Sequence, residues 1–374
     1  MRRATELHVG LPNIPHEQSF LQKVEDLVAG RRLTNNGPNV RRFEKRVCEI
    51  LGVANAVAVC NGTLGLQLAA KALGLSGEVV MPSFTFVATA HALEWIGLKP
   101  VFADIDPATH SIDPRRIAEA ITDHTSAIVG VHLWGTPCDV TGIEAVAKDR
   151  GLPVMYDASH AFASSFGGRK LGGFGSCEVF SLHATKFVHT FEGGVITTND
   201  DALAEKMRLM RNFGFQDYDK VVSAGINAKM TEIAAAMGLC CLDQMDNFKT
   251  VNRRNYLFYA ECLNGIHGIT VLSYREPDQG NYQYVVIEVD EDVCSRSRDE
   301  IVDALHAENV IARRYFWPGC HHMEPYRTLH PDAWTRLPET ERIASRVIVL
   351  PTGQAVDEET IRRVCGIIRE AARQ

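Results

Sequence analysis

Hydrophobic residues recur along the chain in two alternating patterns. Short runs rich in Val, Ala and Ile predict buried strands at residues 56–59, 78–82, 100–103, 126–131 and 154–156. The segments between those runs predict amphipathic helices at residues 64–73, 87–96, 114–121 and 141–148. Strands that alternate with helices form a mainly parallel sheet covered on both faces. The pattern therefore predicts an α/β fold.

The pattern changes beyond residue 157. Two further strand-like runs, 177–180 and 194–198, have no long helix between them, so the sheet is predicted to contain an antiparallel strand. Beyond them, the sequence predicts a half-buried strand at residues 284–289 and helices at residues 229–246, 252–263, 298–308 and 358–373. A chain of 374 residues is longer than one core usually serves. We expect a large domain with an N-terminal arm, residues 1–246, and a smaller domain, residues 247–374.

Composition argues against several classes of function. The formal net charge of −7 gives no broad attraction to nucleic acids, and no polybasic run suggests a membrane surface. No apolar run approaches the roughly 20 residues that cross a bilayer. Because no apolar stretch follows Arg2 and Arg3, we expect no signal peptide and a cytoplasmic location. None of the ten cysteines forms a Cys-x-x-Cys pair, so we expect reduced thiols and no structural zinc.

Three polar clusters fall where predicted strands end, which is where open α/β sheets bind ligands. In the first cluster, Gly62 and Thr63 follow a strand and open a helix. Glycine lets a ligand approach the backbone closely, and the first amides of a helix have no partner within it, so an anion is favoured there. The alternative is an ordinary helix cap by Asn61 or Thr63.

The other two clusters carry an acid and an amine. Asp157 ends a buried strand, where its carboxylate would balance a cationic ring nitrogen; a turn or a helix cap is the alternative. Lys186 lies among small and apolar residues, where desolvation would favour the neutral amine that attacks an aldehyde. A surface lysine is the commoner alternative. Phe86 offers an aromatic ring, either for stacking on a cofactor or for core packing.

These parts together are what pyridoxal phosphate needs: a phosphate cradle, an acid for the pyridine nitrogen, an aromatic ring and an imine-forming lysine. The chain resembles the sugar aminotransferases of the DegT/DnrJ/EryC1/StrS family, in order and spacing, at residues 33–38, 60–63, 81–89, 97–106, 131–135, 156–161, 180–186, 192–194 and 225–230. The resemblance implies an aspartate-aminotransferase-like fold (fold type I), with a large, mostly parallel seven-stranded sheet domain and a smaller α+β C-terminal domain. It also implies pyridoxal 5'-phosphate as cofactor, with pyridoxamine 5'-phosphate in the half-reaction.

The resemblance also implies roles for residues at matching positions. Lys186 would hold the cofactor as an imine, and Asp157 would keep its pyridine nitrogen protonated. Further cofactor contacts would come from Gly62, Thr63, Phe86, His160, Ser181 and Asn227. His160 stands where many relatives have Gln, near the phenolic oxygen, and Asn227 would reach the phosphate in the neighbouring subunit. The resemblance therefore implies a homodimer with shared active sites.

Three segments narrow the implied substrate. Residues 181–186, 227–230 and 315–321 resemble the 4-aminotransferases of the desosamine type more than the 3-amino branch, which usually has Tyr-Pro in place of His183-Ala184. The implied reaction transfers an amino group from L-glutamate to C4 of a nucleotide-linked keto sugar of the TDP-4-keto-6-deoxy-D-glucose type. The side chains that we consider for substrate contacts, each with a structural or surface role as the alternative, are His183, Lys229, Arg313, Tyr315 and His321.

Other functions fit the sequence less well. A nicotinamide enzyme needs Gly-x-Gly-x-x-Gly after a strand, and residues 173–178 lack the third glycine because Glu178 stands there. Residues 320–322, Cys-His-His, lack a distant partner and only weakly indicate a metal site. Within the family, a sugar dehydratase would have His in place of Lys186. A 3-ketosugar or aminocyclitol aminotransferase and a catalytically silent cofactor-binding regulator are the remaining alternatives.

Overall fold

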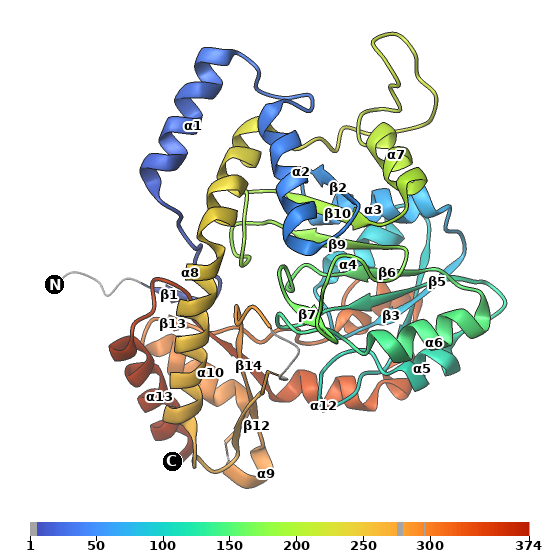
Figure 1. Cartoon of the computed structure of the whole chain (residues 1–374). Helices are drawn as coiled ribbons and strands as arrows, with labels where there is room; N and C mark the ends of the chain where they lie inside the picture. The colour runs from blue at the N-terminus through green and yellow to red at the C-terminus, as the bar shows by residue number, and fades with distance from the viewer. Residues whose placement is uncertain (1–5, 275–279, 295, 374) are drawn as a thin grey trace.

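A seven-stranded sheet forms the centre of the larger part of the molecule (Figure 1). The computed structural model describes residues 6–274, 280–294 and 296–373; residues 1–5, considered above for a signal peptide, lie outside these ranges. Across the sheet the strand order is β2-β10-β9-β6-β5-β3-β4. In chain order, these strands are β2 (Asn55–Val59), β3 (Glu78–Pro82), β4 (Lys99–Ala103), β5 (Thr125–Val131), β6 (Val154–Asp157), β9 (Cys177–Ser181) and β10 (Gly194–Thr198).

One strand of this sheet runs against the others. β10 is antiparallel to both of its neighbours, β2 and β9, and all the other strand pairs are parallel. The antiparallel strand predicted from the missing helix before residue 194 is therefore confirmed. Because β10 alone is reversed, β2, β6 and β9 end at the same edge of the sheet. Asp157 and Ser181 lie at this edge, and the chain leaves β2 there to begin the next helix.

Successive residues of each strand pack into different cores, one on each face of the sheet. In β2, Ala56 and Ala58 belong to one core, and Val57 and Val59 belong to the other. The helices of the first core are α2 (Pro38–Leu51), α5 (Pro114–Ala120), α6 (Val140–Arg150) and α8 (Glu232–Leu263), and those of the second are α3 (Gly62–Leu73), α4 (Val87–Glu94) and α7 (Asp201–Met210). Since both faces are covered, apolar residues face both sides of the strands, as the short apolar runs in the sequence predicted.

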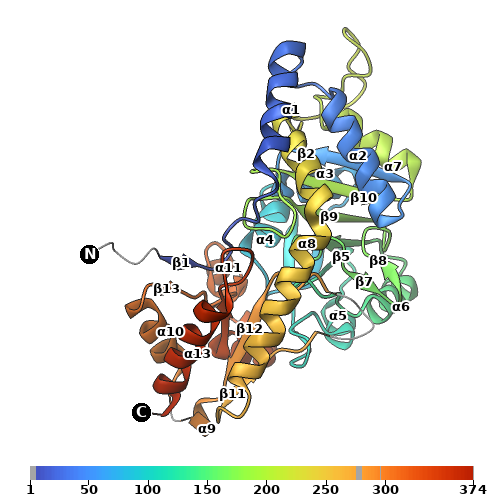
Figure 2. The same cartoon turned by 60° about the vertical axis from the view of Figure 1, so that its left-hand side comes forward.

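Helix α8 runs from the large sheet into the C-terminal part of the molecule (Figure 2). The sequence analysis predicted two helices here, at residues 229–246 and 252–263, and this prediction was wrong. The helix is continuous over 32 residues, because the intervening residues contain neither Pro nor Gly and Phe248 is fully buried in the first core. Lys229 precedes the helix and forms an isolated β-bridge with Val59.

A second, three-stranded antiparallel sheet, β11-β12-β14, carries the C-terminal part of the chain. The N-terminal strand β1 pairs in parallel with β13 and so also lies against this part. The proposed domain boundary after residue 246 stays a prediction; it falls inside α8. The elements not yet given are β1 (Leu7–His8), α1 (Glu17–Gly30), β7 (Ser165–Phe166), β8 (Arg169–Lys170), β11 (Ile269–Val271), β12 (Val285–Val289), α9 (Glu291–Cys294), α10 (Arg298–Ala307), β13 (Val310–Ile311), η1 (Cys320–His322), α11 (Tyr326–Leu329), η2 (Ala333–Arg336), α12 (Pro338–Arg346), β14 (Val347–Leu350) and α13 (Glu358–Arg373). Among the described residues, no helix is both long and apolar enough to span a membrane.

Gly194 begins β10 and lies against the turn that opens α3. A Cβ atom at this position would lie 2.8–2.9 Å from backbone atoms of Asn61 and Gly62. We predict that Gly194→Ala lowers the free energy of unfolding by about 1–3 kcal/mol, the usual cost of overpacking; urea unfolding measures the loss. Gly366→Ala is the matched control, because a Cβ atom there has nothing within 4 Å. Equal losses in both variants would contradict the packing argument.

Candidate active site

A cavity of about 310 Å³ lies at the edge of the sheet where β6 and β9 end. It brings together residues that are far apart in the sequence. Nine of the residues singled out from the sequence line it: Gly62, Thr63, Phe86, Asp157, His160, Ser181, His183, Lys186 and Tyr315. The acid and the amine of the predicted site therefore share one cavity.

Four other residues singled out from the sequence do not line this cavity: Asn227, Lys229, Arg313 and His321. Asn227 is exposed to solvent. Lys229 and Arg313 each place their cationic group over an aromatic ring, 4.8 Å from the Phe213 centroid and 4.9 Å from the Tyr315 centroid. His321 is buried and contacts side chains behind the cavity. Within this one chain, these four residues are separate from the site.

The start of α3 forms one wall of the cavity. The side chain of Asn61 caps the helix by accepting a hydrogen bond from the amide of Leu64 at 2.8 Å. The amides of Gly62 and Thr63 precede that of Leu64 in the same first turn, where a helix offers no acceptor, and both residues line the cavity. A Cβ atom on Gly62 would come within 3.2 Å of the Ser181 Cβ, so glycine lets the helix start approach the end of β9. The helix cap and the anion cradle, which the sequence left as alternatives, are thus compatible.

Asp157 is buried at the end of β6, with 5% of its surface exposed. Its Oδ2 accepts a hydrogen bond of 2.7 Å from the Thr89 hydroxyl, and its Oδ1 accepts one of 3.0 Å from the Ser159 amide. Thr85 lies 3.1 Å from Thr89, hydroxyl to hydroxyl. The Thr89 hydroxyl and the Ser159 amide therefore fix the orientation of this carboxylate at the cavity.

Lys186 lies in the turn after β9, where its amide donates to the carbonyl of His183. Burial of the side chain lowers the pKa of its ammonium group to about 8, although Asp157 opposes this effect. Its Nζ lies 3.5 Å from the hydroxyl of Tyr284. A substantial fraction of this amine is therefore neutral near physiological pH, as a nucleophilic lysine requires.

Aromatic rings surround His160, which is buried on the same cavity. The imidazole centroid lies 4.4 Å from that of Tyr284 and 5.9 Å from that of Phe316. Burial, and then the positive charge of Lys186, hold the pKa of His160 well below its usual value. Its Nδ1 has no hydrogen-bond partner among the described residues. The cavity thus presents a neutral imidazole with a free polar atom.

The sequence analysis missed four residues that shape this site. Thr89 holds the carboxylate, and Gly10, Tyr284 and Phe316 line the cavity from distant parts of the chain. Thr89 stands on α4, 68 residues before Asp157, and the local pattern of that helix does not mark it as a partner of the acid. The other three have no local signal, since only the docking of β1 and β12 and of the chain after β13 brings them to the cavity.

The chain matches known proteins over nearly its whole length. The sequence model of the DegT/DnrJ/EryC1/StrS aminotransferase family matches residues 15–369. The chain belongs to this family. It is therefore an aminotransferase, and its family and fold are those of pyridoxal-phosphate-dependent enzymes.

Two relatives and one solved structure show how similar this aminotransferase is to known ones. The dTDP-4-amino-4,6-dideoxy-D-glucose transaminase of Shigella dysenteriae is 39% identical over 97% of this chain and 98% of that protein. The UDP-N-acetyl-3-dehydro-alpha-D-glucosamine 3-aminotransferase of Acidithiobacillus ferrooxidans is 33% identical over 97% of this chain and 93% of that protein. The crystal structure of DesI in the presence of its TDP-sugar product is 47% identical, with a TM-score of 0.95 over 100% of this chain and 94% of DesI. The predicted fold type is confirmed.

The lowered pKa of Lys186 predicts an unusual pH dependence. In the cofactor-free aminotransferase, the rate of reductive methylation of Lys186 should be half-maximal near pH 8. Only the neutral amine reacts, and below the pKa the neutral fraction falls about tenfold for each pH unit. Ordinary lysines, with a pKa of about 10.4, should still gain reactivity above pH 9. Peptide mass spectrometry across pH 6–11 measures the methylation of Lys186 and of the other lysines. The variant Lys186→Arg identifies the peptide that contains residue 186. A Lys186 profile that keeps rising above pH 9 would contradict burial of the amine.

The hydrogen bond from the Thr89 hydroxyl to the buried carboxylate of Asp157 should stabilise the folded protein. Thr89→Val keeps the shape of the side chain but removes the donor to a buried carboxylate, and hydrogen bonds to charged groups contribute about 1.5–3 kcal/mol. We therefore expect a loss of about 2 kcal/mol in the free energy of unfolding at pH 7, measured with urea. Thr89→Ser, which keeps the hydroxyl, is the control. If the serine variant lost as much as the valine variant, the hydrogen bond would not be the cause.

Proposed function

We propose that this enzyme transfers an amino group from L-glutamate to C4 of a TDP-4-keto-6-deoxy-D-glucose-type nucleotide sugar, with pyridoxal phosphate attached to Lys186. The proposal rests on one observation above others: Lys186 and Asp157 line the same cavity, and burial lowers the pKa of the lysine to about 8. An amine that is partly neutral near physiological pH and a buried carboxylate at one site are the two groups that this cofactor's chemistry requires.

The cavity has features that fit the cofactor. The amides of Gly62 and Thr63, together with the hydroxyl of Ser181, would hold the phosphate at the start of α3, where the helix dipole favours an anion. Phe86, half exposed at the cavity, would stack on one face of the ring. The unpartnered Nδ1 of His160 would hydrogen-bond the phenolic oxygen. A buried polar atom without a partner is costly, so a ligand that satisfies it gains affinity.

When bound, pyridoxal phosphate supplies an aldehyde and a conjugated ring that accepts the negative charge left by proton removal. Asp157 would hold a proton on the ring nitrogen, and hydrogen bonds from Thr89 and Ser159 fix its carboxylate in place for that task. Lys186, once its amine is free, would move a proton between donor carbon and cofactor carbon as general base and acid. The pKa near 8 suits both directions of transfer.

The choice of sugar rests on the relatives and on the cavity rim. The Shigella relative is named for a dTDP-4-amino-4,6-dideoxy sugar, and DesI was solved in the presence of a TDP-sugar product. His183 and Tyr315 line the cavity and would contact the sugar. Lys229, Arg313 and His321 lie off the cavity of their own chain, so any contact of theirs would need the diphosphate to extend outward or a neighbouring subunit.

A homodimer with shared active sites is part of this proposal. Asn227 lies off its own cavity and is exposed, which leaves it free to reach the phosphate of a neighbouring subunit. The segment before it exposes several large apolar side chains: Phe213, Phe215, Tyr218, Val221 and Val222. Exposed apolar patches of this kind are typical of protein–protein contacts.

Two alternatives remain distinct from the main proposal. A 3-ketosugar or aminocyclitol aminotransferase of the same family is favoured by the 33% identity to the Acidithiobacillus 3-aminotransferase. The other alternative is a catalytically silent cofactor-binding regulator. It would bind pyridoxal phosphate but leave it unchanged when glutamate is added.

A substrate comparison tests the proposal. Purified enzyme loaded with pyridoxal phosphate would be offered L-glutamate and either a TDP-4-keto-6-deoxyglucose or a matched 3-keto nucleotide sugar, and the product identified by NMR. We expect amination at C4 with the TDP sugar. Amination of the 3-keto sugar alone would favour the first alternative, and cofactor absorbance that glutamate leaves unchanged would favour the regulator.

Two variants serve as controls for that experiment. Lys186→Ala should bind the cofactor weakly and lose turnover, because the attaching amine is absent. Asp157→Asn should still attach the cofactor, but it should slow proton removal severely because the ring nitrogen loses its counter-charge. Normal turnover by the Lys186 variant would contradict the assignment of the amine.

A further inference from the structure

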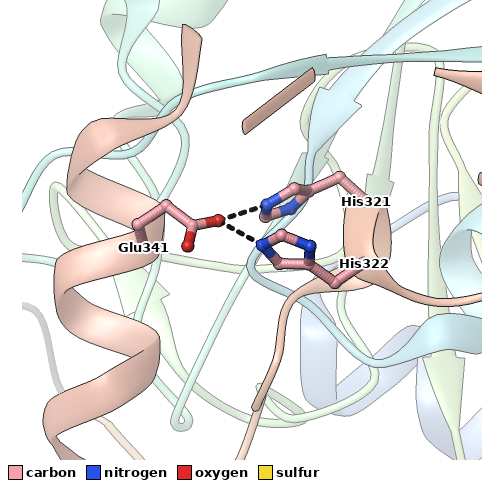
Figure 3. Close-up of side chains that lie close together, drawn as sticks. All are labelled: His321, His322 and Glu341. Atoms are coloured by element: carbon pink, nitrogen blue, oxygen red, sulfur yellow. Dashed lines mark hydrogen bonds and ion pairs between the residues drawn. The ribbon is translucent and has the colours of Figure 1, made fainter. Parts of the chain in front are cut away.

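Three metal-binding side chains converge behind the wall of the cavity. His321 and His322 lie on η1, and Glu341 lies on α12 (Figure 3). The Nε2 atoms of the two histidines lie 2.5 and 2.7 Å from the same carboxylate oxygen of Glu341. The sequence pattern did not show which distant residue meets the adjacent histidines. In the fold this residue is Glu341, about 20 residues further along the chain.

Neighbouring residues hold the ring of His321 and the helix that carries Glu341 in place. The Nδ1 atom of His321 lies 2.6 Å from the buried hydroxyl of Ser83, which is the kind of outer hydrogen bond that orients metal-binding histidines. The helix that carries Glu341 is fixed by Asp104, whose carboxylate accepts the amide and the hydroxyl of Thr340 at 2.8 Å each. The ring of His321 and the start of α12 are therefore held in place.

The cluster is open to solvent on one side. The side chains of His322 and Glu341 are 35% and 39% exposed, whereas that of His321 is only 1% exposed. An ion can thus reach the donor atoms from solvent, past the side chains of His322 and Glu341.

We propose that His321, His322 and Glu341 bind one divalent ion of the zinc class. Two imidazole nitrogens and one carboxylate oxygen suit zinc and similar transition metals, and a water molecule would complete a four-coordinate site. Magnesium and calcium prefer all-oxygen ligands. The donor atoms lie within 4.8 Å of one another, and bonds of about 2.0–2.2 Å would draw the partly exposed side chains of His322 and Glu341 toward the ion.

Metal binding would move one proton within each imidazole. Without an ion, each Nε2 carries the proton that Glu341 accepts. When the metal bonds to Nε2 of His321, that proton moves to Nδ1, which then donates to the Ser83 hydroxyl. His322 likewise shifts its proton to Nδ1, toward solvent. Both imidazoles stay neutral, and the carboxylate charge of Glu341 is shared with the metal.

The metal would connect η1 to α12 directly behind the cavity. The residues just before η1 include Tyr315 and Phe316, both of which line the cavity. Ser83 lies two residues before Thr85, which also lines it. The proposed role is therefore structural: the ion would fix this wall of the cavity. The proposal does not depend on the sugar that the enzyme uses.

Cobalt(II) titration tests the proposal, because cobalt occupies zinc sites and absorbs visible light. Chelator-treated, cofactor-loaded enzyme should saturate at one equivalent per chain, with a tetrahedral spectrum that lacks sulfur-to-cobalt charge transfer. His322→Ala and Glu341→Gln should each abolish stoichiometric binding. Ser83→Ala should weaken it by about 10–100-fold, the usual effect of removing an outer partner. His267→Ala, an exposed histidine elsewhere, should bind as the parent does.

Three outcomes would overturn the proposal. The first is the absence of stoichiometric binding, in which case the three side chains form only a hydrogen-bonded cluster. The second is unchanged binding by His322→Ala. The third is a sulfur charge-transfer band, which would place the ion on some of the ten cysteines. Because His322 is partly exposed, its replacement leaves no buried void, and circular dichroism checks that the variant is folded.

Discussion

The site depends on holding one amine, that of Lys186, below the surface beside a buried carboxylate. Burial lowers the pKa of the ammonium group and Asp157 raises it, and the balance leaves the pKa at about 8. Deeper burial without the acid would remove the positive charge, whereas a closer ion pair would retain the proton. The sheet sets this balance, because β6 and β9 are neighbours whose residues pair at Asp157 and Val179. The turn after β9 then returns the lysine to the same cavity.

A buried carboxylate is stable only if the protein satisfies it. Thr89 and the Ser159 amide do so for Asp157, and both come from segments that follow strand ends. The rings of His160, Tyr284 and Phe316 pack together and line the same cavity as this carboxylate. Lower polarity strengthens each electrostatic contact inside, so hydrogen bonds and aromatic packing act together on Asp157 and Lys186.

Both apolar packing and polar contacts hold the C-terminal part of the chain against the large sheet. Asp104 follows β4 and accepts hydrogen bonds at the start of α12, while Ser83 follows β3 and binds both the amide and the ring of His321. These contacts also fix the segment that carries Phe316. The contacts between the two parts of the chain therefore also shape the cavity. A substitution at these contacts should alter the position of the residues that line it.

The sequence by itself determined most of the elements and the lysine and aspartate of the candidate site. The periodicity of hydrophobic residues is a local property of the sequence, so it predicts helices and strands without a structure. Asp157 ends one predicted strand and Lys186 follows another, so these two residues could also be found from the sequence. The continuity of α8 could not, since its middle residues are kept helical by burial of Phe248. Thr89 on Asp157, Tyr284 beside Lys186, and Glu341 between two histidines were decided only by tertiary structure. These contacts join segments 20 to about 100 residues apart, and no local pattern records which strand ends and helices will meet.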